Sequence, residues 1–287
     1  MSTGEGLASV TDEEWLRAAS RPVRRPQIDA STPNVARVWN YLTGGRDNFD
    51  ADRRAARQLV RVAPAMEYLG YANRAFIGRA ARYLAAEAGV RQFIDIGTGI
   101  PGAGSMHDEV QSVAPESRVV CVDNDPVVLS HARALLRPAP EGATSYVDAD
   151  VREPGTILAE AAATLDFGQP VAVVMNHVLN YVGRDAEVRS ILGRVLDAIC
   201  PGSYLVVVHA ASDLDQSLLD AARRWNKTVA APQVALRGEP QITAWLDDLD
   251  IIDPGVVPVT EWRRDPADDK YDLTIPAYGA VARKPPA

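Results

Sequence analysis

Hydrophobic positions change their spacing near residue 90. Between residues 35 and 88, apolar side chains recur every three or four positions, which is the spacing of one helix face. Gly44, Gly45 and Pro64 interrupt this stretch and predict two or three separate helices. Residues 1–30 mix charged residues with proline and glycine, a composition that indicates a mobile tail.

After residue 90, short apolar runs alternate with segments of helical length. The runs cover residues 93–96, 119–122, 146–147, 171–175 and 204–208. Such alternation is typical of βαβ units on a parallel sheet that is buried on both faces. Two further runs, 256–259 and 278–282, have only a polar loop between them. They predict an antiparallel hairpin at the edge of a doubly wound α/β sheet.

A glycine-rich segment follows the first apolar run. It reads Asp95-Ile96-Gly97-Thr98-Gly99-Ile100-Pro101-Gly102-Ala103-Gly104. Because glycine has no side chain, such a loop lets a ligand approach the backbone closely. Taken alone, the spacing of Gly97, Gly99 and Gly102 also fits the fingerprint of dinucleotide-binding proteins.

Polar residues follow four successive runs, and the carboxyl ends of parallel strands meet at one ligand-binding edge of a sheet. Asp123 ends the second run, Asp150 follows the third and Asn176 follows the fourth. A carboxylate after the second strand can accept both hydroxyls of a ribose, in nicotinamide enzymes and in methyltransferases that use S-adenosylmethionine. The position of Asp95 within the first apolar run favours a methyltransferase over a nicotinamide enzyme. A carboxylate buried in an apolar strand needs a partner such as a ligand ammonium, and a pyrophosphate would gain nothing from its charge.

The order of these motifs resembles that of class I S-adenosylmethionine-dependent methyltransferases. The chain is similar in particular to one bacterial family, the S-adenosyl methyltransferases formerly labelled a domain of unknown function, over roughly residues 30–284. The segments that carry the similarity are PNVARVWNYLTGGRDNF (33–49), NRAF (73–76), QFIDIGTGIP (92–101) and VDNDPV (122–127). One departure from the general class is a loop that reads Gly-x-Gly-x-x-Gly in place of the commoner Gly-x-Gly-x-Gly.

The resemblance implies a Rossmann-like fold. The expected sheet is mixed and has seven strands, six of them parallel and the last antiparallel, under an N-terminal helical cap. The expected organisation is a mobile tail over residues 1–30, a helical cap or lid over 31–90, and a methyltransferase domain over 91–287 that binds S-adenosylmethionine. A lid over the site would exclude water from methyl transfer.

The resemblance also implies roles for single residues. The backbone of the glycine loop would pass beneath the methionine part of the cofactor, Asp95 would face its ammonium, and Asn176 would lie near it. Asp123 would hold the ribose hydroxyls, with Asn124, Asp150 and Val151 at the adenine. Candidates for the cofactor carboxylate or the substrate are Tyr41, Arg46 and Arg74. The expected cofactor-binding residues are Asp95, Gly97, Thr98, Gly99, Asp123, Asn124, Asp150, Val151, Asn176, Tyr41, Arg46 and Arg74.

Two residues are candidates for contact with the methyl acceptor. His177 follows the fourth run and could act as a general base, although a packed histidine bonded to backbone fits its position slightly better. Tyr181 could line a substrate pocket, but aromatic residues at helical spacing more often lie in the core. Asp150 and Asn176 could equally cap the segments that follow them. The histidines are too scattered for a metal site.

Composition and charge narrow the classes of partner. The net charge of −8 gives no electrostatic case for nucleic acid or an anionic membrane. The segment 176–179 also lacks the Asn-Pro-Pro-aromatic pattern of many enzymes that methylate bases. Two cysteines without disulfide or zinc spacing, and a start without signal-peptide pattern, predict a cytoplasmic protein.

The expected function is methyl transfer from S-adenosylmethionine to a small-molecule acceptor. An in-line displacement on a sulfonium can proceed by positioning alone, so a catalytic acid or base need not show in the sequence. A non-catalytic protein that binds S-adenosylmethionine, a nicotinamide-dependent oxidoreductase and a nucleic-acid methyltransferase stay open as alternatives. The acceptor and the oligomeric state stay open as well.

Overall fold

A mixed β-sheet lies at the centre of the molecule. The computed structural model describes residues 28–102, 104–135, 141–228, 232–266, 271 and 273–286, so the predicted tail falls almost wholly outside the described residues. Within them the sheet has eight strands in the order β3-β2-β1-β4-β5-β8-β6, and β7 also pairs with β8. The strands are β1 Gln92–Ile96, β2 Arg118–Asp123, β3 Ala143–Asp148, β4 Ala172–Asn176, β5 Tyr204–Ala210, β6 Asp250–Ile251, β7 Val257–Pro258 and β8 Ala277–Arg283.

Strands β1 to β5 are parallel, and β8 runs antiparallel to β5, as expected for a mixed sheet. The hairpin predicted near the end of the chain is confirmed by the antiparallel pairing of β7 with β8. The predicted count of seven strands is wrong, because two short strands, β6 and β7, share the outer edge of β8. Pro254 and Gly255 separate them, and Pro258 lacks the N–H that a longer ladder would need.

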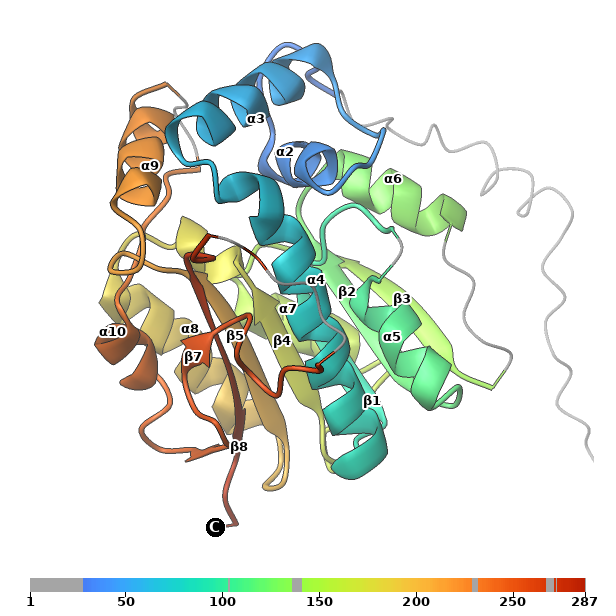
Figure 1. Ribbon diagram of the computed structural model, residues 1–287. Helices are drawn as coiled ribbons and strands as arrows, with labels where there is room; N and C mark the ends of the chain where they lie inside the picture. Colours follow the sequence, from blue (N-terminus) through green and yellow to red (C-terminus); the bar gives the residue numbers. More distant parts are fainter. Residues whose placement is uncertain are drawn as a thin grey trace, which may run out of the picture.

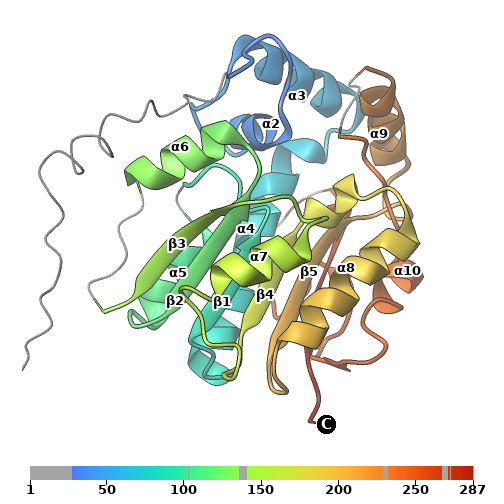
Figure 2. The ribbon, with the colours of Figure 1, turned by 180° about the vertical axis from the view of Figure 1, so that it is seen from behind.

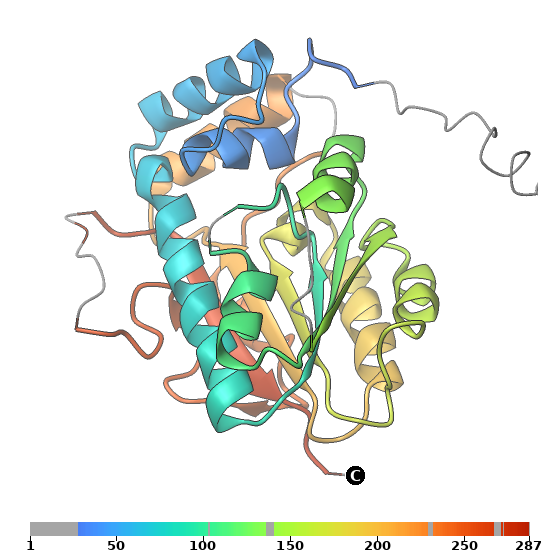
Figure 3. The same cartoon turned by 90° about the vertical axis from the view of Figure 1, so that its right-hand side faces the viewer.

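Helices cover both faces of the sheet. Helices α4 (Met66–Arg82) and α5 (Met106–Val113) lie on the face that Figure 1 turns to the viewer. Helices α7 (Pro154–Ala161) and α8 (Asp185–Ala198) cover the opposite face (Figure 2). The edge-on view of Figure 3 shows these three layers. The apolar strands are therefore buried on both sides, which explains why they read as unbroken hydrophobic runs.

Two helices from the N-terminal part, α2 (Val35–Leu42) and α3 (Asp50–Val62), lie across the top of the sheet, next to α9 (Gln216–Thr228) (Figure 1). Helix α6 (Pro126–Leu135) lies at the same end, and α10 (Glu239–Thr243) lies near the edge strands. A buried ion pair of 3.0 Å between Arg37 and Asp52 joins α2 to α3. Asp52 also accepts the N–H groups of Asn34 and Phe49, so its carboxylate organises both helix starts.

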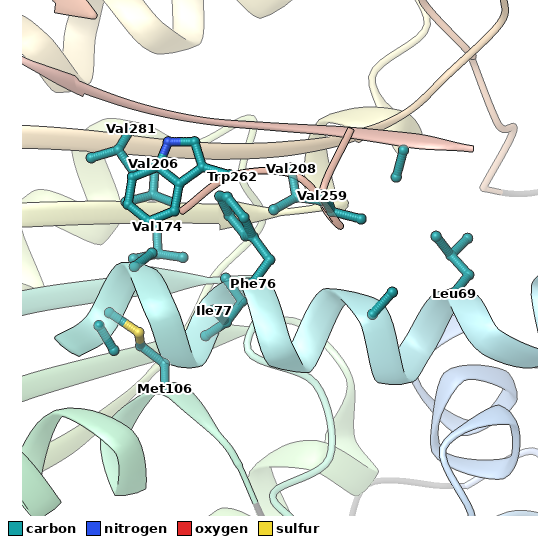
Figure 4. Packing of buried hydrophobic residues seen from close by; sticks show 14 of the residues in the cluster. Leu69, Phe76, Ile77, Met106, Val174, Val206, Val208, Val259, Trp262 and Val281 are labelled. Atoms are coloured by element: carbon teal, nitrogen blue, oxygen red, sulfur yellow. The ribbon is translucent and has the colours of Figure 1, made fainter. Parts of the chain in front are cut away.

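Helix α4 connects the cap to the sheet. Phe76 projects from it and packs edge-on against Trp262, with ring centroids 5.5 Å apart (Figure 4). On the strand beneath, a Cβ at Gly279 would lie 2.6 Å from the Phe76 ring, so only glycine leaves room for this packing. The end of α4 continues as one turn of π-helix, Tyr83–Glu87. Because α4 is anchored in this way, the residues on its cap-side turns have fixed positions above the strand ends.

Among the residues that the structure describes, no helix has both the length and the apolar composition needed to cross a bilayer.

Candidate functional site

A cavity of about 750 Å³ lies where β1, β2, β3 and β4 end, beneath α2 and α4. Most of the predicted site residues line it, and they come from four separate strand ends and one cap helix. These residues are Asp95, Gly97, Thr98, Gly99, Asp123, Asn124, Asp150, Val151, Asn176, His177, Tyr181 and Arg74. A cavity of this size is within the range that holds a cofactor or another small ligand.

The glycine loop turns sharply because two of its residues adopt left-handed backbone conformations. Gly97 has φ +78° and Gly99 has φ +68°. The N–H groups of Gly97 and Thr98 both donate to the carbonyl of Val122, at 2.8 and 3.0 Å, which ties the loop to β2. A Cβ at Gly97 would lie 2.8 Å from the Cβ of Val178, whereas no atom lies within 4 Å of one at Gly99. Gly97 therefore serves packing, and Gly99 leaves its space to the cavity.

The carboxylate of Asp123 is held in a fixed orientation beside this loop. It accepts the N–H of Gly99 at 2.9 Å and the N–H of Asp125 at 3.0 Å. Burial raises the pKa of Asp123 to about 6, although the two backbone donors lower it in part. The carboxylate therefore lies in the cavity wall with an orientation set by the backbone.

Asp95 is buried inside β1 and has no cation near it among the described residues. The hydroxyl of Thr98 donates to its Oδ2 at 2.8 Å. Burial raises the pKa of Asp95 to about 6, and the nearby charge of Asp123 adds to this effect. The two carboxylates give this wall of the cavity a concentrated negative charge whenever both are ionised.

Asp150 is already engaged by its neighbours. Asn124 donates to it at 2.9 Å, and Arg152 forms an ion pair with it at 3.0 Å. The backbone N–H of Arg152 also donates to Asp150, at 2.9 Å, so the carboxylate stabilises the turn that follows β3. Arg152 in turn donates to the carbonyl of Tyr181. Asp150 thus lines the cavity and also stabilises the turn before α7, whose N-cap position is Glu153 and not Asp150.

Arg74 brings a half-buried cation to the cavity from α4. Its Nη2 donates to the Thr43 hydroxyl at 3.0 Å, and the same atom would lie 3.5 Å from a Cβ at Gly102. Burial lowers the pKa of Arg74. In the described part of the chain no carboxylate pairs with this guanidinium, although the side chain is half-buried.

His177 is fully enclosed and bonded to two asparagines rather than to backbone carbonyls. Its Nδ1 lies 3.1 Å from Asn180 Nδ2, and its Nε2 lies 2.5 Å from the amide of Asn73. Asn180 Oδ1 accepts the N–H of Ala210 at 3.3 Å, so the amide nitrogen of Asn180 must donate to Nδ1. The neutral ring therefore carries its proton on Nε2. A half-turn of the Asn73 side-chain amide brings its oxygen, which otherwise has no hydrogen-bond partner, to this N–H.

The environment of His177 keeps the imidazole neutral. Burial lowers its pKa to about 3, and the Trp39 ring stacks on it with centroids 5.1 Å apart. The residue has φ 59°, a left-handed conformation that is unusual outside glycine. Such strain at a cavity wall is typical of functional positions.

Tyr181 closes one side of the cavity. Its hydroxyl accepts a hydrogen bond of 3.3 Å from Trp39 Nε1, and burial raises its pKa to about 12. Tyr181 thus stays neutral at physiological pH and links the turn after β4 to α2.

Two predicted residues do not line the cavity. Tyr41 packs against the hydrophobic cluster around α4, and Arg46 is exposed. For Tyr41 the reason is helical geometry, because residues two positions apart point to opposite sides of a helix, whereas Arg46 lies beyond the end of α2 at Leu42. The side chains of α2 that line the cavity are therefore those of Trp39, the neighbour two positions before Tyr41, and of Val35, Ala36 and Asn40.

Sequence reasoning missed several residues of this cavity. Trp39, Thr43, Asn73 and Arg152 all line it. The spacing of Val35, Trp39 and Thr43 groups them on one face of a helix, but it does not indicate that this face lines a cavity. No local signal pairs Asn73 with a histidine that lies far away in the sequence.

Comparisons with known proteins point in the same direction as this geometry. One family model, described as S-adenosyl methyltransferase, matches residues 21–285. A solved DUF574 family protein from Streptomyces avermitilis MA-4680 is 39% identical, with a TM-score of 0.86 over 90% of this chain and 100% of that one. A protein from Thermobifida fusca YX, provisionally described as a methyltransferase, is 34% identical, with a TM-score of 0.83 over 92% of this chain and 99% of that one. No curated protein matches.

The family match covers nearly all of the described residues, and both structural matches extend over about nine-tenths of the chain. The segments that carried the resemblance lie at the cavity or in the helices that cover it. The chain therefore belongs to the S-adenosyl methyltransferase family, whose cofactor is S-adenosylmethionine.

Proposed function

We propose that the protein transfers a methyl group from S-adenosylmethionine to a small-molecule acceptor. The observation that supports this most strongly is the unpaired charge in the cavity wall. Asp95 has no cation partner and Arg74 has no carboxylate partner among the described residues. The methionine part of the cofactor carries one ammonium and one carboxylate, which would satisfy both groups through charge-assisted hydrogen bonds.

Further polar atoms around the glycine loop fit the same part of the cofactor. Asn176 Oδ1 is buried without a hydrogen-bond partner, and a second acceptor close to Asp95 suits an ammonium with three donors. The open space at Gly99 lets the cofactor lie against the backbone of residues 97–99. We therefore assign the methionine part to Asp95, Asn176, Arg74 and this loop.

The ribose and the adenine follow along the ends of β2 and β3. We assign the ribose hydroxyls to Asp123, because the two backbone N–H groups orient its carboxylate and leave acceptor positions toward the cavity. Asn124, Asp150 and Val151 would lie at the adenine. The ion pair between Asp150 and Arg152 would hold that edge rigid before the cofactor arrives.

The protein's own contribution to the reaction is positioning and the exclusion of water. When bound, the cofactor supplies an electrophilic methyl group, whose carbon–sulfur electron pair stays on sulfur in S-adenosylhomocysteine. Helices α2 and α4 cover the cavity and support the prediction that residues 31–90 act as a lid over a cofactor-binding domain of residues 91–287. Because α4 also packs on the sheet, we expect any lid movement to involve α2 and α3 more than α4.

Neither candidate catalytic residue is suited to proton transfer. A histidine with a pKa of about 3 is too weak a base to take a proton from a hydroxyl or amine. Tyr181, with a pKa of about 12, stays protonated. We therefore propose that both residues position the acceptor and that catalysis comes from in-line alignment. The acceptor's proton then passes to bulk water when the cavity opens to release the product.

We also propose a cytoplasmic location and no role for nucleic acid. The net charge of −8 opposes binding to a polyanion. Cys121 and Cys200 are both free, which suits a reducing compartment.

The test is a parallel calorimetric titration with S-adenosylmethionine, S-adenosylhomocysteine and NAD. We expect micromolar binding of the first two ligands and none of NAD, because a pyrophosphate at the glycine loop would meet the negative charge of Asp95. Binding of NAD alone would refute the proposal. A screen for methyl transfer from labelled S-adenosylmethionine to small molecules then tests the catalytic step.

A further inference from the structure

A second pocket, with apolar walls, opens beside the cofactor cavity. It holds about 70 Å³ and lies where α2, α3 and the start of α4 face α9. Among the described residues that line this pocket, none is charged. Only Asn180 and Tyr181 have polar side chains, apart from the indole nitrogens of Trp39 and Trp225. Its walls include Leu42, Leu59, Met66, Leu218, Ala222 and Trp225.

The two spaces meet at a wall formed by Val35, Trp39 and Tyr181, which line both of them. The hydrogen bond from Trp39 Nε1 to the Tyr181 hydroxyl forms the boundary between them. The charged groups that we assign to the cofactor, by contrast, come from the glycine loop, from the ends of the strands and from Arg74. The lining thus changes from charged to apolar across the Trp39–Tyr181 pair.

We propose that this apolar pocket receives an alkyl group of the methyl acceptor, and that the acceptor is an uncharged molecule whose nucleophilic oxygen or nitrogen lies beside Trp39 and Tyr181. The inference rests on the proposed function, because it names the substrate class for the same site. A cavity of roughly 150 Å³ holds benzene, so a pocket of about half that volume accepts about three carbon atoms.

The requirement for an uncharged acceptor follows from the groups at the boundary. His177 and Tyr181 are both neutral there, and Trp39 uses its indole N–H for Tyr181. Arg152, which lies near the Tyr181 carbonyl, is already paired with Asp150 and with Glu187. A charged acceptor would therefore be buried at this end without a partner, at a large cost in free energy.

The pocket can be filled without touching the cofactor cavity. Ala222 lines only the apolar pocket, so Ala222→Leu should occupy its volume. Thr228→Leu adds leucine at an exposed position of the same helix and serves as the matched control. Leu59→Ala enlarges the pocket from α3 and provides a variant with the opposite effect.

The probes are phenol, 4-ethylphenol, 4-propylphenol and 4-hexylphenol, titrated calorimetrically into protein saturated with S-adenosylhomocysteine. These phenols are uncharged at neutral pH and carry a hydroxyl that can accept a methyl group. In the unmodified protein and in Thr228→Leu we expect Kd to fall about fourfold per added methylene up to propyl. In Ala222→Leu the dependence on chain length should vanish, and in Leu59→Ala it should extend toward hexyl.

All variants should keep the Kd for S-adenosylhomocysteine of the unmodified protein, which also reports that they are folded. The inference would be overturned if none of the phenols bound to the unmodified protein, or if their affinity for it did not depend on chain length. A dependence on chain length that survives in Ala222→Leu would also overturn it. Failure of the proposed function would show differently, as absence of S-adenosylhomocysteine binding by the unmodified protein.

Discussion

Replacing Gly97 by alanine tests how the glycine loop packs against the 3₁₀ turn Val178–Tyr181. The new Cβ would lie 2.8 Å from the Cβ of Val178 and 2.9 Å from its Cγ2. Both distances are shorter than non-bonded carbon atoms tolerate. The alanine must also adopt φ +78°. A left-handed conformation costs about 1–2 kcal/mol, and overpacking adds about 1–3 kcal/mol. We therefore expect Gly97→Ala to lower the free energy of unfolding by about 2–5 kcal/mol.

Two other glycines separate these contributions. Gly89 has φ +71° and Gly99 has φ +68°, and no atom lies within 4 Å of a Cβ built at either position. Gly89→Ala and Gly99→Ala should therefore lower the free energy of unfolding only by the cost of the left-handed conformation, about 1–2 kcal/mol. Gly99 faces the cavity, so its alanine variant should also bind S-adenosylmethionine more weakly, whereas Gly89→Ala should bind it normally.

The assay is urea unfolding of the three variants, combined with calorimetric titration of S-adenosylmethionine. In a Val178→Gly background, which lacks both the Cβ and the Cγ2 of Val178, Gly97→Ala should lower the free energy of unfolding by no more than Gly89→Ala does, because the collision is gone. Equal losses for Gly97→Ala and Gly89→Ala would refute the packing argument. Unchanged cofactor affinity in Gly99→Ala would refute the placement of the cofactor against this loop.

Four further predictions concern the ionisable groups of the cavity. Asp123→Ala should weaken S-adenosylmethionine binding by about 1–3 kcal/mol in calorimetry, because the ribose hydroxyls lose their acceptor; an unchanged affinity would contradict the ribose placement. S-adenosylmethionine affinity should fall as pH drops through about 6, since protonated Asp95 cannot pair with an ammonium, and a flat profile between pH 5 and 8 would argue against this contact. The stability of the free protein should show the opposite trend. Asp95 and Asp123 have folded pKa values of about 6, above the ordinary 3.8, so their stabilising contribution is complete below about pH 4 and is lost as pH rises through 6. His177→Ala should lower the free energy of unfolding by about 1–3 kcal/mol, because Asn73 and Asn180 lose their partner. It should leave S-adenosylmethionine affinity nearly unchanged, and a large loss in the titration would place His177 in the cofactor site.

Much of this protein could be predicted from local patterns. Strands β1, β2, β4 and β5 were recognisable because burial on both faces requires continuous apolar runs. Strand β3 lies at the sheet edge and is only partly buried, so its apolar run covered only residues 146–147. Asp95, Asp123 and Asn176 were recognisable because each follows or lies within such a run, and parallel strands bring their carboxyl ends to one edge. The glycine loop was recognisable because a sharp turn close to a ligand requires residues without side chains.

Other features depend on contacts between distant segments. Whether Trp39 or Tyr41 faces the cavity depends on how α2 packs over the sheet, which its own sequence does not specify. Pro254 and Gly255 interrupt the run between β6 and β7, but the pairing of both short strands with the same edge of β8 depends on the assembled sheet. The partners of the His177 ring come from α4 and from the following turn, and they decide its charge and its tautomer.

The division between the two kinds of feature has one physical cause. The sequence by itself determined the alternation of strands and helices, the glycine loop and the acidic residues at the strand ends, because these depend on the backbone and on neighbours along the chain. Only the tertiary structure decided that Arg74 and Asn73 face the same cavity as Asp95, and that an apolar pocket opens beside Tyr181. These features arise where the cap, the sheet and α9 bury surface against one another, and burial depends on all the partners at once.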